Sequence, residues 1–339
     1  MNKISSIFSF NEHISLKIKI IKKIGALALG FIIIEIFLMF NSHRFFIKDY
    51  QLKKSIDSFN FRKNDVDLLF LGASGVYAGV NPDDIKINNY KIHNFGFPSE
   101  SIQTTYYKIN HYINNNDLKN LKVVVLEIRK GYLYENNKLS VTKDLNYSQY
   151  YDLPDILNVN GPREFLSVFL HKINLFRLRK DFINQFKINM VIHEEKIKEN
   201  GYALRKNKID RKYLKDQKNF LQNLSNRGLN SKCHPVPIYY YKKLIELLND
   251  HDVRVFLIQL PGAGVLLENE DNSHIYDFSE QKMLPVVQSY FSDIPFLNYA
   301  ESKNEWVIND FSDRGHLNYI GAKKLGKLIQ ADLQRILSR

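Results

Sequence analysis

The sequence has almost no cysteine. Cys233 is the single cysteine among 339 residues, so no disulfide bond can form within the chain. It has no cysteine neighbours with which to hold a zinc ion, and we expect it to be a buried or inert thiol. The glycine-rich patterns of phosphate-binding and dinucleotide-binding loops are missing as well. The sequence therefore predicts neither a metal nor an organic cofactor.

A nucleic-acid recognition motif is also missing, although the chain is strongly basic, with a net charge of +12. Much of this charge lies in residues 163–232, where 17 basic and 7 acidic residues give a net charge of +10. These residues belong to a segment rich in Lys, Asn and Tyr, 133–232, which we expect to be a mainly helical insertion. The insertion is either a solvated cap or a basic lid that attracts an anionic polymer or a lipid surface.

Near the N-terminus, residues 24–40 form an apolar run with one charge, Glu35. As a helix this run would be about 26 Å long, which is the short end of a bilayer span. A cleaved signal peptide and a buried core helix are alternatives, but no small-residue cleavage site follows in NSHRFF. We expect a cytoplasmic basic tail (1–23), a transmembrane anchor (24–40) and a polar stem (41–64). The positive-inside rule then places the rest of the chain outside, because four lysines precede the run: Lys17, Lys19, Lys22 and Lys23.

After the stem, short apolar runs alternate with helix-like segments. The expected strands are DVDLLFL, ending at residue 71; YKIHNFG, ending at 94–96; LKVVVLEI; DVRVFLIQL; and residues 295–299. The expected helices are 99–114, 237–249, 280–291 and 319–337. This alternation predicts an α/β fold, a three-layer, flavodoxin-like arrangement with a mostly parallel sheet and helices on both faces. Residues 65–132 and 233–339 would form this domain, interrupted by the insertion.

Three residues that are far apart in the sequence have the chemistry of a serine esterase. Ser74 follows the first expected strand, and DFSDRGHLNYIGA places Asp313 and His316 near the C-terminus. A serine hydroxyl needs a base to take its proton, and the base needs a group that orients it. His316 and Asp313 can supply these two roles. The surrounding GASGV is not the Gly-x-Ser-x-Gly turn of α/β-hydrolases, because position 76 is Val76.

The arrangement resembles the SGNH/GDSL hydrolase superfamily. In that family the nucleophile follows the first strand in a Gly-Asp-Ser-like block, a glycine in a second block donates a backbone N–H, and Asp-x-x-His closes the domain. LGASGVYAGVNP, NFGFPSES with Gly96, and DRGHLNYIGAKKLGKLI match these blocks over about 65–135 and 234–339. Two departures stand out: Ala73 replaces the usual acidic residue, and LEIRKGY stands where Gly-x-Asn-Asp is usual.

The second departure affects the oxyanion hole, because the missing asparagine normally supplies one of its donors. Losing one donor costs roughly 3–4 kcal/mol of barrier. The resemblance implies that the N–H groups of Ser74 and Gly96 remain, and Arg129 is a candidate to replace the third donor. The alternative for Arg129 is a surface arginine paired with Glu127.

The resemblance extends to membrane-anchored, SGNH-like proteins of bacterial envelope acylation. It implies a single-pass protein of the bacterial cytoplasmic membrane whose catalytic domain lies in the periplasm or on the outer surface. Such a protein would move O-acyl groups, with acetyl expected, on an anionic or acylated polysaccharide, beside a membrane-bound O-acyltransferase. Two alternatives stay open: a membrane-surface esterase or lysophospholipase, and a non-catalytic component of a glycan acylation complex.

Overall fold

The computed structural model describes residues 19–38, 47–129, 133, 150–173, 196–210, 233–263, 283–300 and 305–338. After a helix over residues 19–38, the helices are α2 (Ile47–Arg62), α3 (Ser74–Gly79), α4 (Ile102–Asn114), α6 (Leu153–Asn160), α7 (Pro162–Lys172), α10 (Pro235–Asn249), α12 (Met283–Tyr290) and α13 (Tyr319–Leu337), with 3-10 turns η1 (Pro82–Asp84) and η5 (Ile308–Asp310). The strands are β1 (Leu68–Leu71), β2 (Ile92–Asn94), β3 (Val123–Glu127), β4 (Lys196–Ile197), β5 (Ala203–Leu204), β6 (Arg254–Gln259), β7 (Phe296–Asn298), β8 (Phe311–Asp313) and β9 (His316–Leu317).

Five of these strands form one sheet in the order β2-β1-β3-β6-β7, and every neighbouring pair in it is parallel. The central strands are continuous apolar runs, because helices cover both faces of the sheet. The predicted α/β fold with a mostly parallel sheet is therefore confirmed, and each expected strand is present. The expected helix 319–337 coincides with α13.

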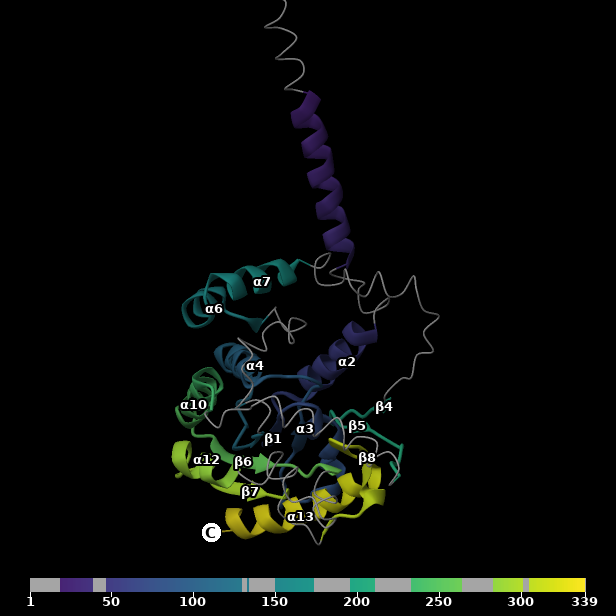
Figure 1. Cartoon of the computed structure of the whole chain (residues 1–339), viewed down its shortest axis with the longest axis vertical. Coiled ribbons are helices and arrows are strands. Elements are labelled where there is room, and N and C mark those ends of the chain that lie inside the picture. Colours follow the sequence, from purple (N-terminus) through teal and green to yellow (C-terminus); the bar gives the residue numbers. More distant parts are fainter. Residues whose placement is uncertain are drawn as a thin grey trace, which may run out of the picture.

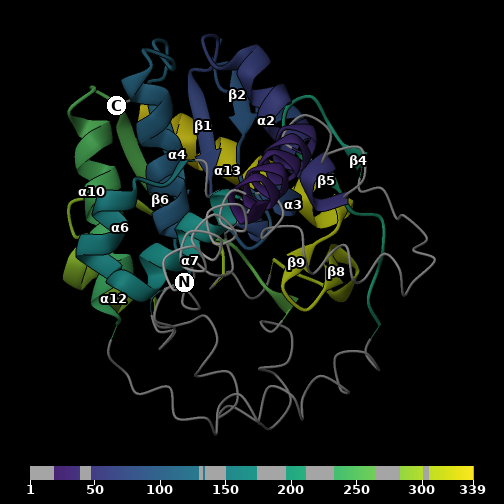
Figure 2. The ribbon, with the colours of Figure 1, turned by 90° about the horizontal axis from the view of Figure 1, so that it is seen from above.

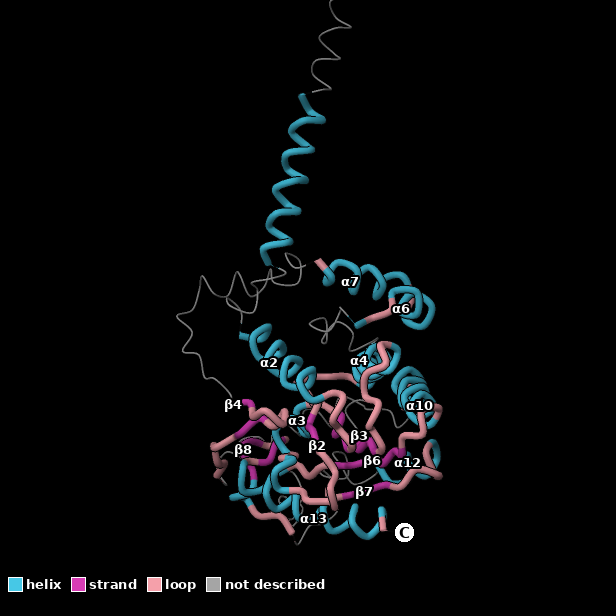
Figure 3. The backbone as a smooth tube through the Cα atoms, turned by 180° about the vertical axis from the view of Figure 1, so that it is seen from behind, coloured by secondary structure: helices cyan, strands magenta, loops and turns pink. Residues whose placement is uncertain are grey.

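Alternating residues of the strands point to opposite faces and build two separate cores. On one face, Leu69, Val124 and Leu257 pack in a cluster with residues of α4, α10 and α12. On the other, Phe70 and Val125 pack with residues of α3 and α13. Figure 3 shows the strands between α4 and α10 on one side and α13 on the other.

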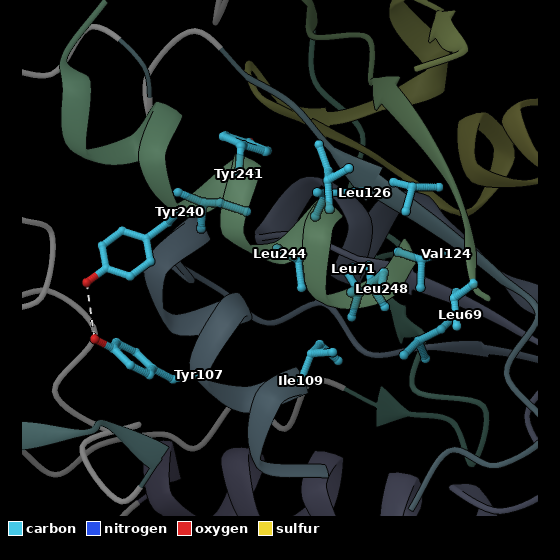
Figure 4. Close-up of a cluster of buried hydrophobic side chains, with 14 of the residues drawn as sticks. Leu69, Leu71, Tyr107, Ile109, Val124, Leu126, Tyr240, Tyr241, Leu244 and Leu248 are labelled. Carbon is cyan, nitrogen blue, oxygen red and sulfur yellow. Dashed lines mark hydrogen bonds between the residues drawn. The ribbon is translucent and has the colours of Figure 1, made fainter. Parts of the chain in front are cut away.

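Two tyrosine hydroxyls lie at the rim of the first core, where α4 meets α10. The hydroxyl oxygens of Tyr107 and Tyr240 are 3.1 Å apart (Figure 4). Both rings contribute to the buried cluster, while Asp155 of α6 accepts a hydrogen bond from each hydroxyl. The described helices of the insertion are thus joined to the sheet domain by polar contacts at the edge of an apolar core.

The described parts of the insertion contact the domain at several places. Ile156 of α6 and Val168 of α7 are fully buried in the cluster that contains residues of α4 and α10. The β4–β5 hairpin lies at the opposite edge of the sheet, next to β2, where the backbone N–H of Asn94 donates to the carbonyl of Asn200. Residues 134–149, 174–195 and 211–232 of the insertion lie outside the described part of the chain.

The segment expected to be a polar stem contains α2, and one side of this helix belongs to the core. Phe59 is fully buried and stacks on Phe95 with ring centroids 3.8 Å apart. Upstream, residues 19–38 form a helix outside the sheet domain (Figure 1). Within the described segments, no helix combines the length and the apolar character needed to cross a membrane. The transmembrane anchor at 24–40 stays a prediction.

Candidate active site

The nucleophile candidate is placed by the end of a buried strand. β1 ends at Leu71, and Ser74 is the first residue of α3. Gly96 follows β2 and Arg129 follows β3, the two strands that flank β1 in the sheet. Because neighbouring parallel strands end at the same edge, all three predicted positions lie beyond the carboxyl edge of the sheet, where ligands bind in such folds.

Ser74, His316 and Asp313 form a continuous chain of hydrogen bonds. Nε2 of His316 is 2.7 Å from Oγ of Ser74, although the two residues are 242 positions apart. Nδ1 of His316 lies 2.7 and 2.8 Å from the two carboxylate oxygens of Asp313. An ionised carboxylate only accepts hydrogen bonds, so Nδ1 carries the imidazole proton and Nε2 is free to accept the proton of Ser74. The three predicted residues are therefore brought together in the order that nucleophilic catalysis requires.

A tight hairpin brings the Asp and His of the Asp-x-x-His motif together. Asp313 and His316 are paired across the antiparallel strands β8 and β9, which puts both side chains on one face. The N–H of Gly315 in the turn donates to Oδ1 of Asp313 at 2.8 Å. Figure 2 shows this hairpin beside α3, the helix that carries the serine.

The residues after His316 hold the hairpin on α13. Asn318 is fully buried and caps this helix, with Oδ1 accepting the N–H groups of Ile320 and Gly321. Its amide group donates back to the carbonyl of Phe311 on β8 at 3.1 Å. A side chain at Gly321 would lie 2.2 Å from the carbonyl oxygen of Asp310. The sequence that follows the histidine thus orients it by fixing both strands of the hairpin to one helix end.

Arg205 of the insertion is the site residue that sequence reasoning missed. Its Nη1 donates to Oδ2 of Asp313 at 2.8 Å, from the segment just after β5. Burial alone would raise the pKa of Asp313, but hydrogen bonds from His316 and Gly315 and the charge of Arg205 outweigh it, so this pKa lies below its ordinary value. Asp313 therefore stays ionised. No local signal in the sequence marks Arg205, because it is one of 17 basic residues in 163–232.

A buried carboxylate supports the turn before the nucleophile. Oε2 of Glu127, at the end of β3, accepts the N–H of Ala73 at 2.7 Å. Side chains at Gly72 and Gly75 would come within 2.5 and 2.4 Å of the same carboxylate. The two glycines make room for Glu127, so the acidic group at this turn comes from β3 rather than from position 73.

Gly96, a predicted oxyanion donor, is already hydrogen-bonded within the protein. Its N–H donates to Oδ1 of Asn94 at 3.0 Å. The amide group of Asn94 in turn donates to the carbonyl of Val76 in α3 and to that of Val80 just after it, at 2.7 and 2.6 Å. Asn94 therefore ties the Gly96 loop to the nucleophile helix, and Gly96 can serve as a donor only by exchanging this bond. Its oxyanion role stays a prediction.

Arg129 lies next to Glu127, as its alternative interpretation stated. Its Nε is 3.9 Å from Oε1 of Glu127, and its side chain is 35% exposed while that of Glu127 is 3% exposed. The partly exposed arginine thus lies between the buried carboxylate and the solvent. Its part in an oxyanion hole, together with the N–H of Ser74, stays a prediction.

Comparison with models of known protein families gives no match, and comparison with curated proteins gives none either. Among the solved structures that are similar to this chain are the following two. One is a putative acylhydrolase from Bacteroides fragilis, with 14% identity, a TM-score of 0.37, and coverage of 81% of this chain and 89% of that one. The other is a GDSL-like lipase from Bacteroides thetaiotaomicron, with 10% identity, a TM-score of 0.37, and coverage of 85% and 98%. The names of both agree with the SGNH/GDSL resemblance of the sequence, but at these TM-scores the likenesses carry no argument about activity, which must follow from the site itself.

Proposed function

We propose that this chain is an SGNH-like serine esterase or O-acyltransferase. The observation that carries the proposal is the hydrogen-bond chain from Ser74 through His316 to Asp313. Each donor and acceptor in it is oriented for proton transfer from the serine, and the carboxylate at its end is ionised.

The reaction follows from these three groups. Oγ of Ser74 attacks the ester carbonyl carbon while its proton passes to Nε2 of His316. The bond between the carbonyl carbon and the alcohol oxygen then breaks as that proton is returned to the leaving oxygen. The acyl group is now bonded to Ser74. A second hydroxyl, from a sugar, a polyol or water, repeats the sequence in reverse and regenerates the serine. Asp313 holds the ring and stabilises the imidazolium that forms in each half.

Within this reaction class we favour acyl transfer on a cell-envelope or secreted polysaccharide. The basic insertion supports an anionic or acylated polymer as substrate, because a net charge of +10 over 163–232 attracts anions. The helix over residues 19–38 exposes large apolar side chains such as Ile21, Leu27 and Phe37, which supports a hydrophobic attachment outside the sheet domain. On this proposal the chain is attached to the bacterial cytoplasmic membrane with its N-terminus inside, and a membrane-bound O-acyltransferase is its partner.

A non-catalytic role in a glycan acylation complex is the second candidate. The hydrogen bond from Gly96 to Asn94 favours it, because this N–H is not directed at a substrate. An acyl-binding component would keep the fold and tolerate loss of the serine hydroxyl.

The deciding experiment compares the wild type with Ser74→Ala for hydrolysis of short acyl esters and for the acyl content of the surface glycan. We expect a loss of at least about 10³-fold in ester hydrolysis and a loss of glycan acylation. Ser292→Ala is the matched control, because this serine is exposed and its hydroxyl donates to the neighbouring Asp293. Loss of glycan acylation with little hydrolysis in the wild type supports transfer. Unchanged behaviour of Ser74→Ala in both assays contradicts an enzymatic role.

A further inference from the structure

Residues 196–210, here named the strap, are a described part of the insertion that reaches the triad. The strap begins with the β4–β5 hairpin at the edge of the sheet and then runs along the β8–β9 hairpin. Its two ends contact the two segments that shape the candidate active site.

The hairpin end of the strap is anchored on β2 and η1. Asn94 donates its backbone N–H to the carbonyl of Asn200 at 2.9 Å. Lys198 and Asn200 both bind the carboxylate of Asp83, at 2.8 and 2.7 Å. Gly201 has φ +85°, and a side chain there would lie 1.7 Å from the carbonyl oxygen of Asn94. These contacts fix where the following residues run.

The other end of the strap is fixed at the triad through backbone and side chain together. The carbonyl of Arg205 accepts the N–H of Tyr319 at the start of α13, at 2.9 Å. Four residues later, the N–H of Ile209 donates to the carbonyl of Phe311 at 3.3 Å. The guanidinium of Arg205 therefore starts from a backbone that is bound to both ends of the segment that holds Asp313 and His316.

The carboxylate of Asp313 has two oxygens, and each has its own anchor besides His316. Oδ1 accepts the N–H of Gly315, and Oδ2 accepts Nη1 of Arg205, both at 2.8 Å. The side chains of Arg205 and Asp313 are 20% and 32% exposed, so water competes for Oδ2 as soon as the arginine is removed. A charge-assisted hydrogen bond of this kind holds the carboxylate in the one orientation that points at Nδ1 of the imidazole.

We propose that Arg205 is a positioning residue of the active site: it holds Asp313, and through Asp313 it holds His316 against Ser74. This inference rests on the proposed function. It also assigns a positioning task to the insertion, because the strap supplies a second side chain, besides that of His316, at Oδ2 of Asp313.

Two effects of Arg205 oppose each other, and the geometry decides between them. Its positive charge weakens the electrostatic stabilisation of the His316 imidazolium by Asp313. This effect by itself slows the reaction. Its hydrogen bond fixes the carboxylate and hence the base, and a misplacement of about 1 Å can cost roughly 100-fold in rate. Removing Arg205 loses the hydrogen bond on a partly exposed carboxylate, where charge effects are screened by water. The loss of positioning is therefore the larger effect.

The test measures how fast Ser74 reacts with a fluorophosphonate probe, a readout that needs no knowledge of the natural substrate. The Oγ–P bond forms, the P–F bond breaks, fluoride leaves and the serine proton passes to His316. We expect Arg205→Met to react about 10- to 100-fold more slowly than the wild type, because a hydrogen bond to a charged group is lost. Arg205→Lys keeps a donor and the charge, and should recover part of the rate.

Arg335→Met is the matched control, because it removes an exposed arginine–carboxylate ion pair on α13 away from the triad and should react within about 2-fold of the wild type. The second readout is the downfield NMR signal of the His316 Nδ1 proton, which should be shifted or lost in Arg205→Met and kept in Arg335→Met. A wild-type rate in Arg205→Met, a faster one, or a slow rate with an unchanged proton signal overturns the role of Arg205. Absence of labelling at Ser74 in the wild type overturns the proposed function instead.

Discussion

The triad and the predicted oxyanion region differ in how their polar groups are used. In the triad, each side chain is hydrogen-bonded to the next one in the order of proton transfer, from Ser74 to Asp313. In the predicted oxyanion region, two of the three candidate donors contact other groups of the protein. Gly96 donates to Asn94, and Arg129 lies beside Glu127. Groups for moving a proton are therefore in place, while two of the three predicted donors for negative charge on a substrate already contact protein groups.

This difference has a physical cause in where the partners come from. The triad side chains extend from a hairpin and a helix start, beyond the sheet edge, where a substrate would meet them. Asn94 and Glu127 end buried strands, so their polar atoms need partners inside the protein and take the nearest N–H groups. A substrate must offer Gly96 or Arg129 a better acceptor than the one each has now.

The largest expected effect separates the two interpretations of Arg129. We expect Arg129→Met to lower kcat for ester hydrolysis by about 10²- to 10³-fold with little change in KM, because an oxyanion donor acts mainly in the transition state. Arg335→Met, which removes an exposed ion pair with Asp332, should leave kcat within about 2-fold. An unchanged kcat in Arg129→Met would assign this arginine to the Glu127 ion pair alone.

The next effect tests whether Asn94 holds the predicted oxyanion region together. Asn94→Ala removes hydrogen bonds to α3, to Val80 just after it and from Gly96, all buried, and should lower the free energy of unfolding by about 3 kcal/mol. Denaturant unfolding measures this value, and Asn114→Ala on the exposed surface of α4 should change it by less than about 0.5 kcal/mol. Equal stability of the two variants would show that the Asn94 contacts contribute nothing net.

The smallest effect is a loss of folding stability in acid, which we expect from His93 on β2. Burial, followed by the charges of Arg62 and Lys108, lowers the pKa of His93 on β2 from 6.5 to about 3. Between these values the unfolded chain binds a proton that the folded chain does not, so stability is complete above pH 6.5 and falls as the pH decreases. We expect a loss of about 2 kcal/mol at pH 5.

His93→Leu should remove this part of the pH dependence, as measured by denaturant unfolding at pH 8 and pH 5. The lowered pKa of Asp313 keeps the triad carboxylate ionised over the same range, so the β2 region should weaken while the triad keeps its charge. A pH dependence in His93→Leu equal to that of the wild type would contradict this assignment.

The sequence was informative wherever local patterns reflect burial. Continuous apolar runs predicted β1, β3 and β6, because strands covered on both faces have no polar side. The start of the helix after His316 could also be predicted from neighbouring residues, because Asn318 caps α13 by accepting N–H groups two and three residues later. Arg205 and Asn94 were not predictable in their roles. The arginine meets Asp313 across 108 positions, and nothing in its own surroundings distinguishes it from the other basic residues of the insertion.

The sequence by itself determined the α/β sheet, four of its helices and the choice of the three candidate triad residues, because strand pattern, capping and catalytic residue types are local properties. Only the tertiary structure decided which groups surround the triad. It placed an arginine of the insertion on Asp313, a carboxylate of β3 under the serine turn, and an asparagine on the N–H of Gly96. These contacts depend on which segments the folded sheet brings to one edge.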